Sequence, residues 1–231
     1  MTSLASTADR GVAYLVCIMD TITPSATTRV YQHLKRAILE RIHADGALLS
    51  EAEIAASVGV SRTPVREALL RLESEGLVAL YPKRGVLVRP VSAQEIEDVI
   101  DARRLVEVHA AGRAWVRRAA LVGVLEPLLD EMRAARDRCD AIALMTADRA
   151  FHATVVDAGG NEILTELYQR LRDRQMRIGV AAMRVEPERM DRALADHAQL
   201  IDTLRGDDPA RWTALVEQHI GTAALHLRPA R

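Results

Sequence analysis

The chain has 231 residues, 49% apolar and 27% charged, a composition that excludes intrinsic disorder as its general state. One Phe, two Trp and four Tyr leave Leu, Val, Ile, Ala and Met to build the core, which favours packed helices and argues against an all-β fold. The formal net charge of −1 hides an uneven distribution, because residues 24–91 carry ten basic and seven acidic residues whereas residues 92–231 carry 20 and 23.

The N-terminal segment and the two cysteines bear on location. The apolar run at residues 11–19 is too short to span a bilayer and makes a poor signal peptide, so no membrane association is expected. Because Met19 ends this run, residues 1–23 are expected to be disordered or to lie upstream of the true start. Cys17 and Cys139 are far apart, which argues against a disulfide framework or a Cys-based metal site and favours the cytoplasm.

Residues 24–91 are predicted to form a small domain that begins with two helices. A shorter helix starts at Ser50, where Ser50 and Glu53 match a capping box, and it ends at Gly59. Before it, apolar residues recur at helical spacing between Thr28 and Ile42, namely Val30, Leu34, Ala37, Ile38 and Ile42.

A third helix is predicted to start at Ser61. Pro64 lacks an N–H and has a fixed φ, which a helix tolerates in its first turn, so Ser61 is the expected N-cap and Gly76 the expected end. The apolar positions predicted to face inward are Val65, Leu69, Leu72 and Leu77. The exposed first turns then carry Arg62, Thr63 and Arg66.

Two extended segments follow this helix, LVALY at residues 77–81 and GVLVRP at residues 85–90. PKRG at residues 82–85 is typical of a turn between hairpin strands. Three helices followed by a hairpin predict a winged helix-turn-helix. In that fold the third helix enters the major groove of DNA, and the turn residues Lys83 and Arg84 reach the backbone or the minor groove.

The front of the third helix has the chemistry for DNA contact. Arg62 and Arg66 lie one turn apart and can pair bidentately with guanine, while Ser61 and Thr63 can donate to phosphates. A solvated basic face is the ordinary explanation for an isolated pair of this kind. The capped short helix before it and the wing after it favour double-stranded DNA instead.

Residues 92–231 show no strand pattern and are predicted to form an all-α antiparallel bundle, so that the whole chain is mainly α. SAQE at residues 92–95 matches a second capping box, and Asp208-Pro209 is an expected helix start. The helical patterns cover about residues 92–119, 123–139, 141–158, 161–183, 186–205 and 209–226.

Four side chains of the bundle are candidates for a metal site. Asp148 and His152 lie at i and i+4 on one helix face, and His197 and His219 are expected at similar height in an antiparallel hairpin. One carboxylate and three imidazoles suit Zn²⁺, Ni²⁺ or Mn²⁺. An ordinary core or surface histidine is the alternative for each taken alone, and it is expected for His33, His43, His109 and His226.

Arg103 has two possible roles that the sequence leaves open. Arg103 and Glu107 lie at i and i+4, so Glu107 can be a purely structural partner of a buried arginine. Alternatively, Arg103 faces a cavity and binds a carboxylate ligand, which suits the arginine fork.

The stretch VSRTPVREALLRLESEGLV, residues 60–78, closely resembles the DNA-binding signature of the GntR family of bacterial transcription regulators. The helical remainder is similar to the FCD effector domain of the FadR-like subgroup. The motifs that carry this second resemblance are DRAFH, GGNEIL, DHAQLI and EQHI, in the family's order.

The resemblance implies a homodimer that binds a pseudo-palindromic operator and responds to a small organic acid or sugar acid, whose carboxylate meets a bound metal. By position it makes Arg62, Thr63 and Arg66 the DNA-contacting residues and Gly85 the wing-tip glycine. It also matches Asp148, His152, His197 and His219 to the family's metal ligands and Arg103 to an effector-facing arginine. Two departures are Ala52, where many members have a DNA-contacting arginine, and Asp45-Gly46 in place of Pro-Gly.

The leading hypothesis is therefore a ligand-responsive transcription regulator, expected to be a repressor, with residues 24–91 binding DNA and residues 92–231 binding the effector and dimerising. One alternative is a metal-dependent hydrolase-like enzyme, although no general base stands out beside the four candidate ligands. The other is a regulator that senses the metal itself.

Overall fold

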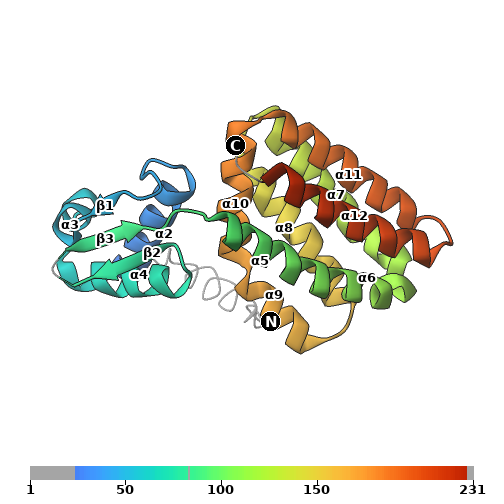
Figure 1. Ribbon diagram of the computed structural model, residues 1–231, viewed down its shortest axis with the longest axis horizontal. Coiled ribbons are helices and arrows are strands. Elements are labelled where there is room, and N and C mark those ends of the chain that lie inside the picture. Colours follow the sequence, from blue (N-terminus) through green and yellow to red (C-terminus); the bar gives the residue numbers. More distant parts are fainter. Residues whose placement is uncertain (1–23, 83, 228–231) are drawn as a thin grey trace, which may run out of the picture.

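The computed structural model describes residues 24–82 and 84–227, with side chains through Thr222. The expectation for residues 1–23 and the position of Lys83 lie outside the described residues. Figure 1 shows two lobes, an N-terminal lobe with a small sheet and a larger bundle made only of helices. The mainly α prediction, a winged helix-turn-helix followed by a helical bundle, is confirmed. Among the described helices, none is both long enough and apolar enough to cross a membrane.

The N-terminal lobe contains α2 (Ala26–Leu39), α3 (Glu51–Val58) and α4 (Arg62–Ser74) around a three-stranded sheet. Strands β1 (Leu48–Leu49), β2 (Val78–Tyr81) and β3 (Gly85–Val88) are antiparallel in the order β1-β3-β2. The two hairpin strands were predicted, whereas β1 was not. Its two residues carry no strand pattern, and only pairing with β3 makes them a strand.

The first helix differs from the prediction at its end. It stops at Leu39, and Ile42, predicted to lie on the apolar stripe, is 69% exposed. The chain turns away because Arg41 adopts a left-handed φ of 56°. The predicted inward positions of α4, namely Val65, Leu69, Leu72 and Leu77, are all buried.

Helix starts in this lobe follow their capping residues. The capping box of α3 is complete, and Gly59 ends that helix with a φ of 69°. Ser61 is the N-cap of α4, as predicted, but its side chain makes no capping hydrogen bond. The Ser61 hydroxyl therefore stays available to an outside acceptor.

The bundle begins with α5 (Ala93–Arg103), which continues through a π-helical turn (Arg104–Val108) into α6 (His109–Ala114). The remaining helices are α7 (Arg118–Asp137), α8 (Ala141–Ala158), α9 (Glu162–Arg170), α10 (Arg172–Val185), α11 (Glu188–Leu204) and α12 (Pro209–Leu227).

Three local predictions for the bundle are wrong. The first break falls at a 3₁₀ turn at Trp115–Arg117 instead of residues 119–123, and the helix predicted over 161–183 is divided at Leu171. Ser92 does cap α5 by accepting a hydrogen bond from the Glu95 amide, but the second half of the capping box is absent. The Glu95 carboxylate instead pairs with Arg177, 2.7 Å away, because a buried arginine needs a partner.

Aliphatic side chains and few aromatics fill the bundle core, as the composition predicted. Leu125, Met132, Phe151 and Trp212 are almost fully buried within it. The one polar atom of the Trp212 ring is satisfied, since Nε1 donates to the Ala111 carbonyl at 3.0 Å. This packing holds α8, α11 and α12 together, and these helices carry the four candidate metal ligands.

Candidate functional site

The three histidines predicted to bind a metal meet inside the bundle. The Nε2 atom of His152 on α8 lies 3.2 Å from the Nε2 atoms of both His197 on α11 and His219 on α12. Ligand atoms of the three rings all lie within 4.8 Å of one another, and all three residues are buried. Asp148 completes the group, with its Oδ1 atom 3.3 Å from His197 Nε2 and 4.0 Å from His152 Nε2.

Each ring has an acceptor on its other nitrogen. His197 Nδ1 donates to the Ala193 carbonyl at 2.7 Å, His152 Nδ1 lies 2.7 Å from Glu107 Oε2, and His219 Nδ1 lies 3.3 Å from Asp196 Oδ2. A proton held on Nδ1 leaves the lone pair on Nε2. Three Nε2 lone pairs then point at one another, an unfavourable arrangement that a shared cation relieves. The residues present therefore fit a divalent metal.

The charges of the group suit such a cation at neutral pH. Burial lowers the pKa of His197 to about 4, and it also lowers the pKa of His219, so both rings are neutral and able to coordinate. Burial would raise the pKa of Asp148, but its electrostatic interactions with the neighbouring histidines and with Arg103 outweigh burial, and the pKa is lowered. One carboxylate and three imidazole nitrogens are the resulting donor set.

Arg103 both pairs with Glu107 and faces a cavity, the two arrangements that the sequence left open. Its Nε atom donates to Glu107 Oε1 at 2.6 Å, while its side chain also lines a cavity next to His219 and Asp148. Burial alone would raise the pKa of Glu107, yet Arg103 and His152 hold that pKa well below its usual range. Glu107 is thus an ionised carboxylate with almost no solvent exposure.

The role of Glu107 at the histidines was missed by the sequence analysis. It contacts His152 and Arg103, and it accepts a hydrogen bond from the Tyr168 hydroxyl at 2.8 Å. Glu107 lies in the π-helical turn, which shifts the helix register by one residue and is common at functional sites. The i,i+4 spacing to Arg103 was a visible signal, but nothing local indicated the contact with His152. Asp196, which faces His219, was missed for the same reason.

The cavity beside the histidines has a volume of about 240 Å³. It is bounded by α5, α8, α10, α11 and α12, and Arg103, Asp148 and His219 lie in its wall. A molecule in this cavity would reach the open side of the histidine group.

The predicted DNA-binding residues lie on the surface of the N-terminal lobe. Ser61, Arg62, Thr63 and Arg66 are exposed at the start of α4, and Arg66 Nε is 2.9 Å from Glu51 Oε2. Arg84 is exposed at the hairpin turn, next to Gly85. Gly85 has a φ of 111°, and a Cβ there would lie 2.6 Å from the Leu49 carbonyl oxygen, so only glycine fits.

The other described histidines lie outside the metal-ligand group, as expected. His33 and His109 are exposed and His43 is partly exposed. The side chain of His226 lies outside the described residues.

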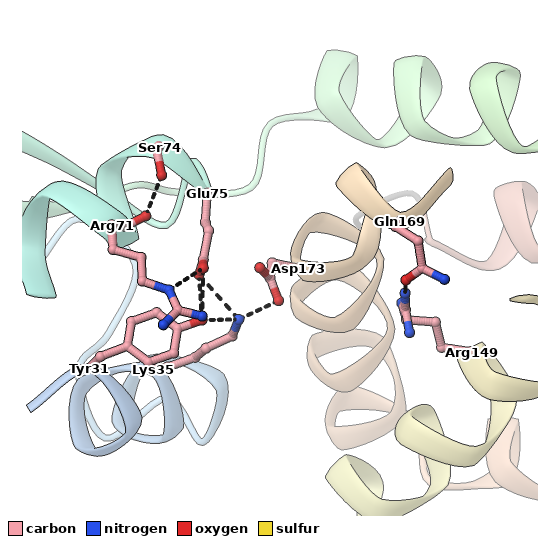
Figure 2. A network of polar contacts seen from close by, with 8 residues as sticks. All are labelled: Tyr31, Lys35, Arg71, Ser74, Glu75, Arg149, Gln169 and Asp173. Carbon is pink, nitrogen blue, oxygen red and sulfur yellow. Dashed lines mark hydrogen bonds and ion pairs between the residues drawn. The ribbon is translucent and has the colours of Figure 1, made fainter. Parts of the chain in front are cut away.

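A cluster of polar contacts joins the two lobes (Figure 2). Lys35 on α2 donates to Asp173 on α10, and it also lies 3.1 Å from Glu75 at the end of α4. The Tyr31 hydroxyl donates to Glu75 at 2.7 Å, and the Arg71 guanidinium stacks 3.7 Å from the Tyr31 ring centre. The end of α4 is thereby linked to α10.

Arg177, also on α10, holds the connection between the lobes. Its Nη1 atom donates to the Arg89 carbonyl at 2.9 Å, and its Nη2 atom donates to Glu95 at 2.7 Å. Arg89 follows β3, and Glu95 lies in the first turn of α5. One side chain of the bundle therefore contacts both ends of the segment that joins the two lobes.

Comparison with known proteins assigns both halves of the chain. Residues 26–88 match the bacterial regulatory proteins of the gntR family, and residues 98–222 match the FCD domain. An HTH-type transcriptional regulator of Streptomyces ambofaciens is 34% identical over 80% of this chain and 78% of its own. The gluconate operon transcriptional repressor of Bacillus subtilis is 29% identical over 80% of this chain and 78% of its own.

A solved structure agrees with the fold of both lobes. The crystal structure of a putative transcriptional regulator GntR from Rhodococcus sp. RHA1 aligns with 88% of this chain and 98% of its own at a TM-score of 0.71 and 25% identity. The predicted resemblance is confirmed, and the hydrolase alternative is wrong, because the relatives and both domains are those of regulators. This chain belongs to the GntR family of bacterial transcription regulators and carries an FCD domain.

Proposed function

We propose that this regulator is a repressor whose bundle binds a divalent metal and a small organic acid, and whose N-terminal lobe releases or retains DNA accordingly. Residues 24–91 serve as the DNA-binding domain, and residues 92–231 as the effector-binding and dimerisation domain. The observation that carries the proposal is the meeting of three Nε2 lone pairs beside a cavity that also contains Arg103. Two relatives named as repressors support the sign of regulation.

DNA recognition is assigned to the start of α4 and to the wing. Arg62 and Arg66 read base edges, Ser61 and Thr63 contact phosphates, and Lys83, Arg84 and Gly85 form the wing tip. Their exposure supports this, except for Lys83, which is not described. Arg66 exchanges its exposed contact with Glu51 for a base, at a cost of no more than about 1 kcal/mol for a surface ion pair.

Fluorescence anisotropy with an operator fragment and a scrambled fragment tests this surface. Arg66→Ala should remove the preference for the operator, because a bidentate arginine contact contributes about 1–3 kcal/mol of discrimination. Arg36→Ala is the matched control, since it removes the same charge from an exposed position on α2. Equal operator affinity in Arg66→Ala and the control would contradict the assignment.

The metal is assigned to Asp148, His152, His197 and His219. A cation held by these four side chains would supply positive charge that attracts the carboxylate of an acid in the cavity. The donor set suits Zn²⁺, Ni²⁺ or Mn²⁺. Metal content after dialysis and the thermal stability of the metal-loaded and chelator-treated protein test the assignment, with loss of bound metal expected in His197→Ala.

Arg103 is assigned the role of binding the carboxylate of the acid. Its Nε atom donates a hydrogen bond to Glu107, whereas its two terminal nitrogens make no hydrogen bond within the described residues. They are therefore available to a carboxylate in the cavity. The relative named for the gluconate operon supports an acid as effector.

A sensor of the metal alone uses the same four ligands and is the second candidate, favoured by the histidine group itself. The two candidate functions predict different effects of metal and acid on the affinity for DNA. Affinity that follows the metal alone supports the metal sensor, whereas affinity that changes only when metal and acid are both present supports acid sensing.

Helix α10 is assigned the role of transmitting effector binding from the cavity to the N-terminal lobe. This helix lines the cavity with Ile178 and Met183, and it contacts the N-terminal lobe through Asp173 and Arg177. A ligand that moves α10 changes the orientation of the two recognition helices of the dimer relative to the operator half-sites. Unchanged small-angle scattering together with unchanged DNA affinity at saturating acid would contradict this route.

A homodimer in the cytoplasm completes the proposal. Two copies related by two-fold symmetry match a pseudo-palindromic operator, because each places one recognition helix in one half-site. Light scattering should give twice the chain mass of 25.4 kDa. A monomer at operator-binding concentrations would contradict the dimer.

A further inference from the structure

The wall of the cavity has a polar histidine end and an apolar body, and α11 and α12 add the polar residues Arg189, Arg192, Asp196 and Thr222. Arg103, Asp148, Gln175 and His219 gather at the histidine end. The body of the wall is made by Ile96, Val99, Ile100, Met145, Ile178 and Met183, together with alanines and a glycine. On α5, α8 and α10 the same order holds, with one polar residue at one end of the lining stretch and apolar residues along the rest.

We infer that the effector is a monocarboxylic acid with an apolar body, and that polyhydroxylated sugar acids are disfavoured. This inference rests on the proposed function, because it assumes that the acid's carboxylate lies at the histidine end. It differs from what the name of the gluconate operon relative suggests.

The free donors of the cavity match one carboxylate. The terminal nitrogens of Arg103 make no hydrogen bond within the described residues. Gln175 interacts with Tyr168, and its Nε2 atom is buried away from the cavity. The Thr222 hydroxyl already donates to the Gln218 carbonyl at 2.9 Å. The two terminal nitrogens of Arg103 can therefore hold the two oxygens of a single carboxylate.

The apolar body cannot satisfy a row of hydroxyl groups. A hydroxyl that lies against these apolar side chains loses its hydrogen bonds to water without replacement, whereas a methylene group gains by the same transfer. Met145 and Met183 add adaptability, because the unbranched thioether side chain adjusts to the shape of an apolar ligand. Gly179 on α10 leaves room for the Met145 side chain, since a Cβ at position 179 would collide with it.

The two remaining arginines of the wall do not provide a second carboxylate site. Arg189 and Arg192 both pair with Glu186, at 2.9 Å in the case of Arg189. A second carboxylate at that end would share these arginines with the Glu186 carboxylate, and the two negative charges would repel each other. The cavity thus favours a monocarboxylate over a dicarboxylate.

Three acids with the same six-carbon chain test the inference on the metal-loaded, full-length protein. Hexanoate has an apolar body, gluconate has a hydroxyl on every carbon after the carboxylate, and adipate has a second carboxylate. Thermal shift and calorimetry should show hexanoate binding about tenfold or more tightly than either, because one buried hydroxyl without a partner already weakens binding by that order.

Two methionine variants on one helix test the contact with the apolar body. Met183 lines the cavity and is 6% exposed, whereas Met176 is 7% exposed, lies on the same helix and does not line it. Met183→Gln should weaken hexanoate binding severalfold more than Met176→Gln does, while both variants keep the metal. The comparison separates an effect on the cavity from a general loss of stability.

The outcomes of these binding experiments distinguish a failure of this inference from a failure of the proposed function on which it rests. Tighter binding of gluconate or adipate than of hexanoate overturns the inference and leaves the metal- and acid-dependent regulator intact. The absence of any shift with all three acids overturns the inference and also the role of acids. Loss of metal binding or of operator binding is measured separately and counts against the proposed function itself.

Discussion

Replacing Glu107 with glutamine is the sharpest perturbation of the buried site. The carboxylate accepts from Arg103 at 2.6 Å and from Tyr168 at 2.8 Å, and it lies 2.7 Å from His152 Nδ1. Glutamine keeps the shape but removes the charge. Arg103, which is 9% exposed, is then left as a buried cation without its counter-ion.

The structure sets two magnitudes for Glu107→Gln. Breaking a buried ion pair by removing one partner costs about 3–5 kcal/mol of unfolding free energy, and we expect the lower end because the amide oxygen still accepts one hydrogen bond. Metal affinity should fall about 10- to 100-fold, because the group that holds the His152 ring and its tautomer is lost.

Two assays on one variant separate these effects. Urea unfolding of the metal-free protein reports stability, and competition with a chromogenic chelator reports metal affinity. Glu126→Gln is the control, since Glu126 pairs with Arg205 where both side chains are about half exposed, and its loss should cost about 0–1 kcal/mol. If Glu107→Gln unfolds at the same urea concentration as Glu126→Gln and binds metal as the parent does, the assigned role of Glu107 is wrong.

Three further predictions follow from the same structure. The free energy of unfolding of the metal-free protein should fall by about 3 kcal/mol between about pH 6.5 and pH 4. In this window His197 is protonated in the unfolded chain but stays neutral in the folded protein, where its pKa is about 4. Unfolding free energies that do not change with pH would contradict this. Asp173→Asn should reduce the effect of acid on DNA affinity about threefold or more, by removing the contact with Lys35; an unchanged ratio contradicts the proposed route. Gly85→Ala should destabilise the protein by about 1–3 kcal/mol, whereas Gly123→Ala, in open space on α7, should not; equal thermal stabilities contradict the strained φ.

Local sequence determined the recognition helix. Pro64 has to lie in a first turn, Ser61 precedes it, and the apolar spacing from Val65 to Leu77 leaves one buried face. Each of these features depends on residues within a few positions of one another. The wing-tip glycine was assigned through family resemblance, and the structure supplies its physical reason in the close approach of Leu49.

Helical periodicity also brought the four candidate metal ligands together, because spacing along a helix and height in an antiparallel hairpin are regular. It could not supply their partners. Glu107 reaches His152 only because a π-helical turn interrupts α5 and α6, and Asp196 reaches His219 only because α11 and α12 pack side by side. Such contacts depend on register between helices, which no local pattern encodes.

Tertiary structure alone decided how the lobes meet. Lys35 and Asp173 are 138 residues apart, and strand β1 exists only where Leu48 and Leu49 pair with β3. The sequence by itself determined which segments are helices and which faces are apolar, since these follow from near-neighbour spacing. The interface, the extra strand and the division of the cavity into polar and apolar parts required the packed chain, because each joins groups that are close in space and distant in sequence.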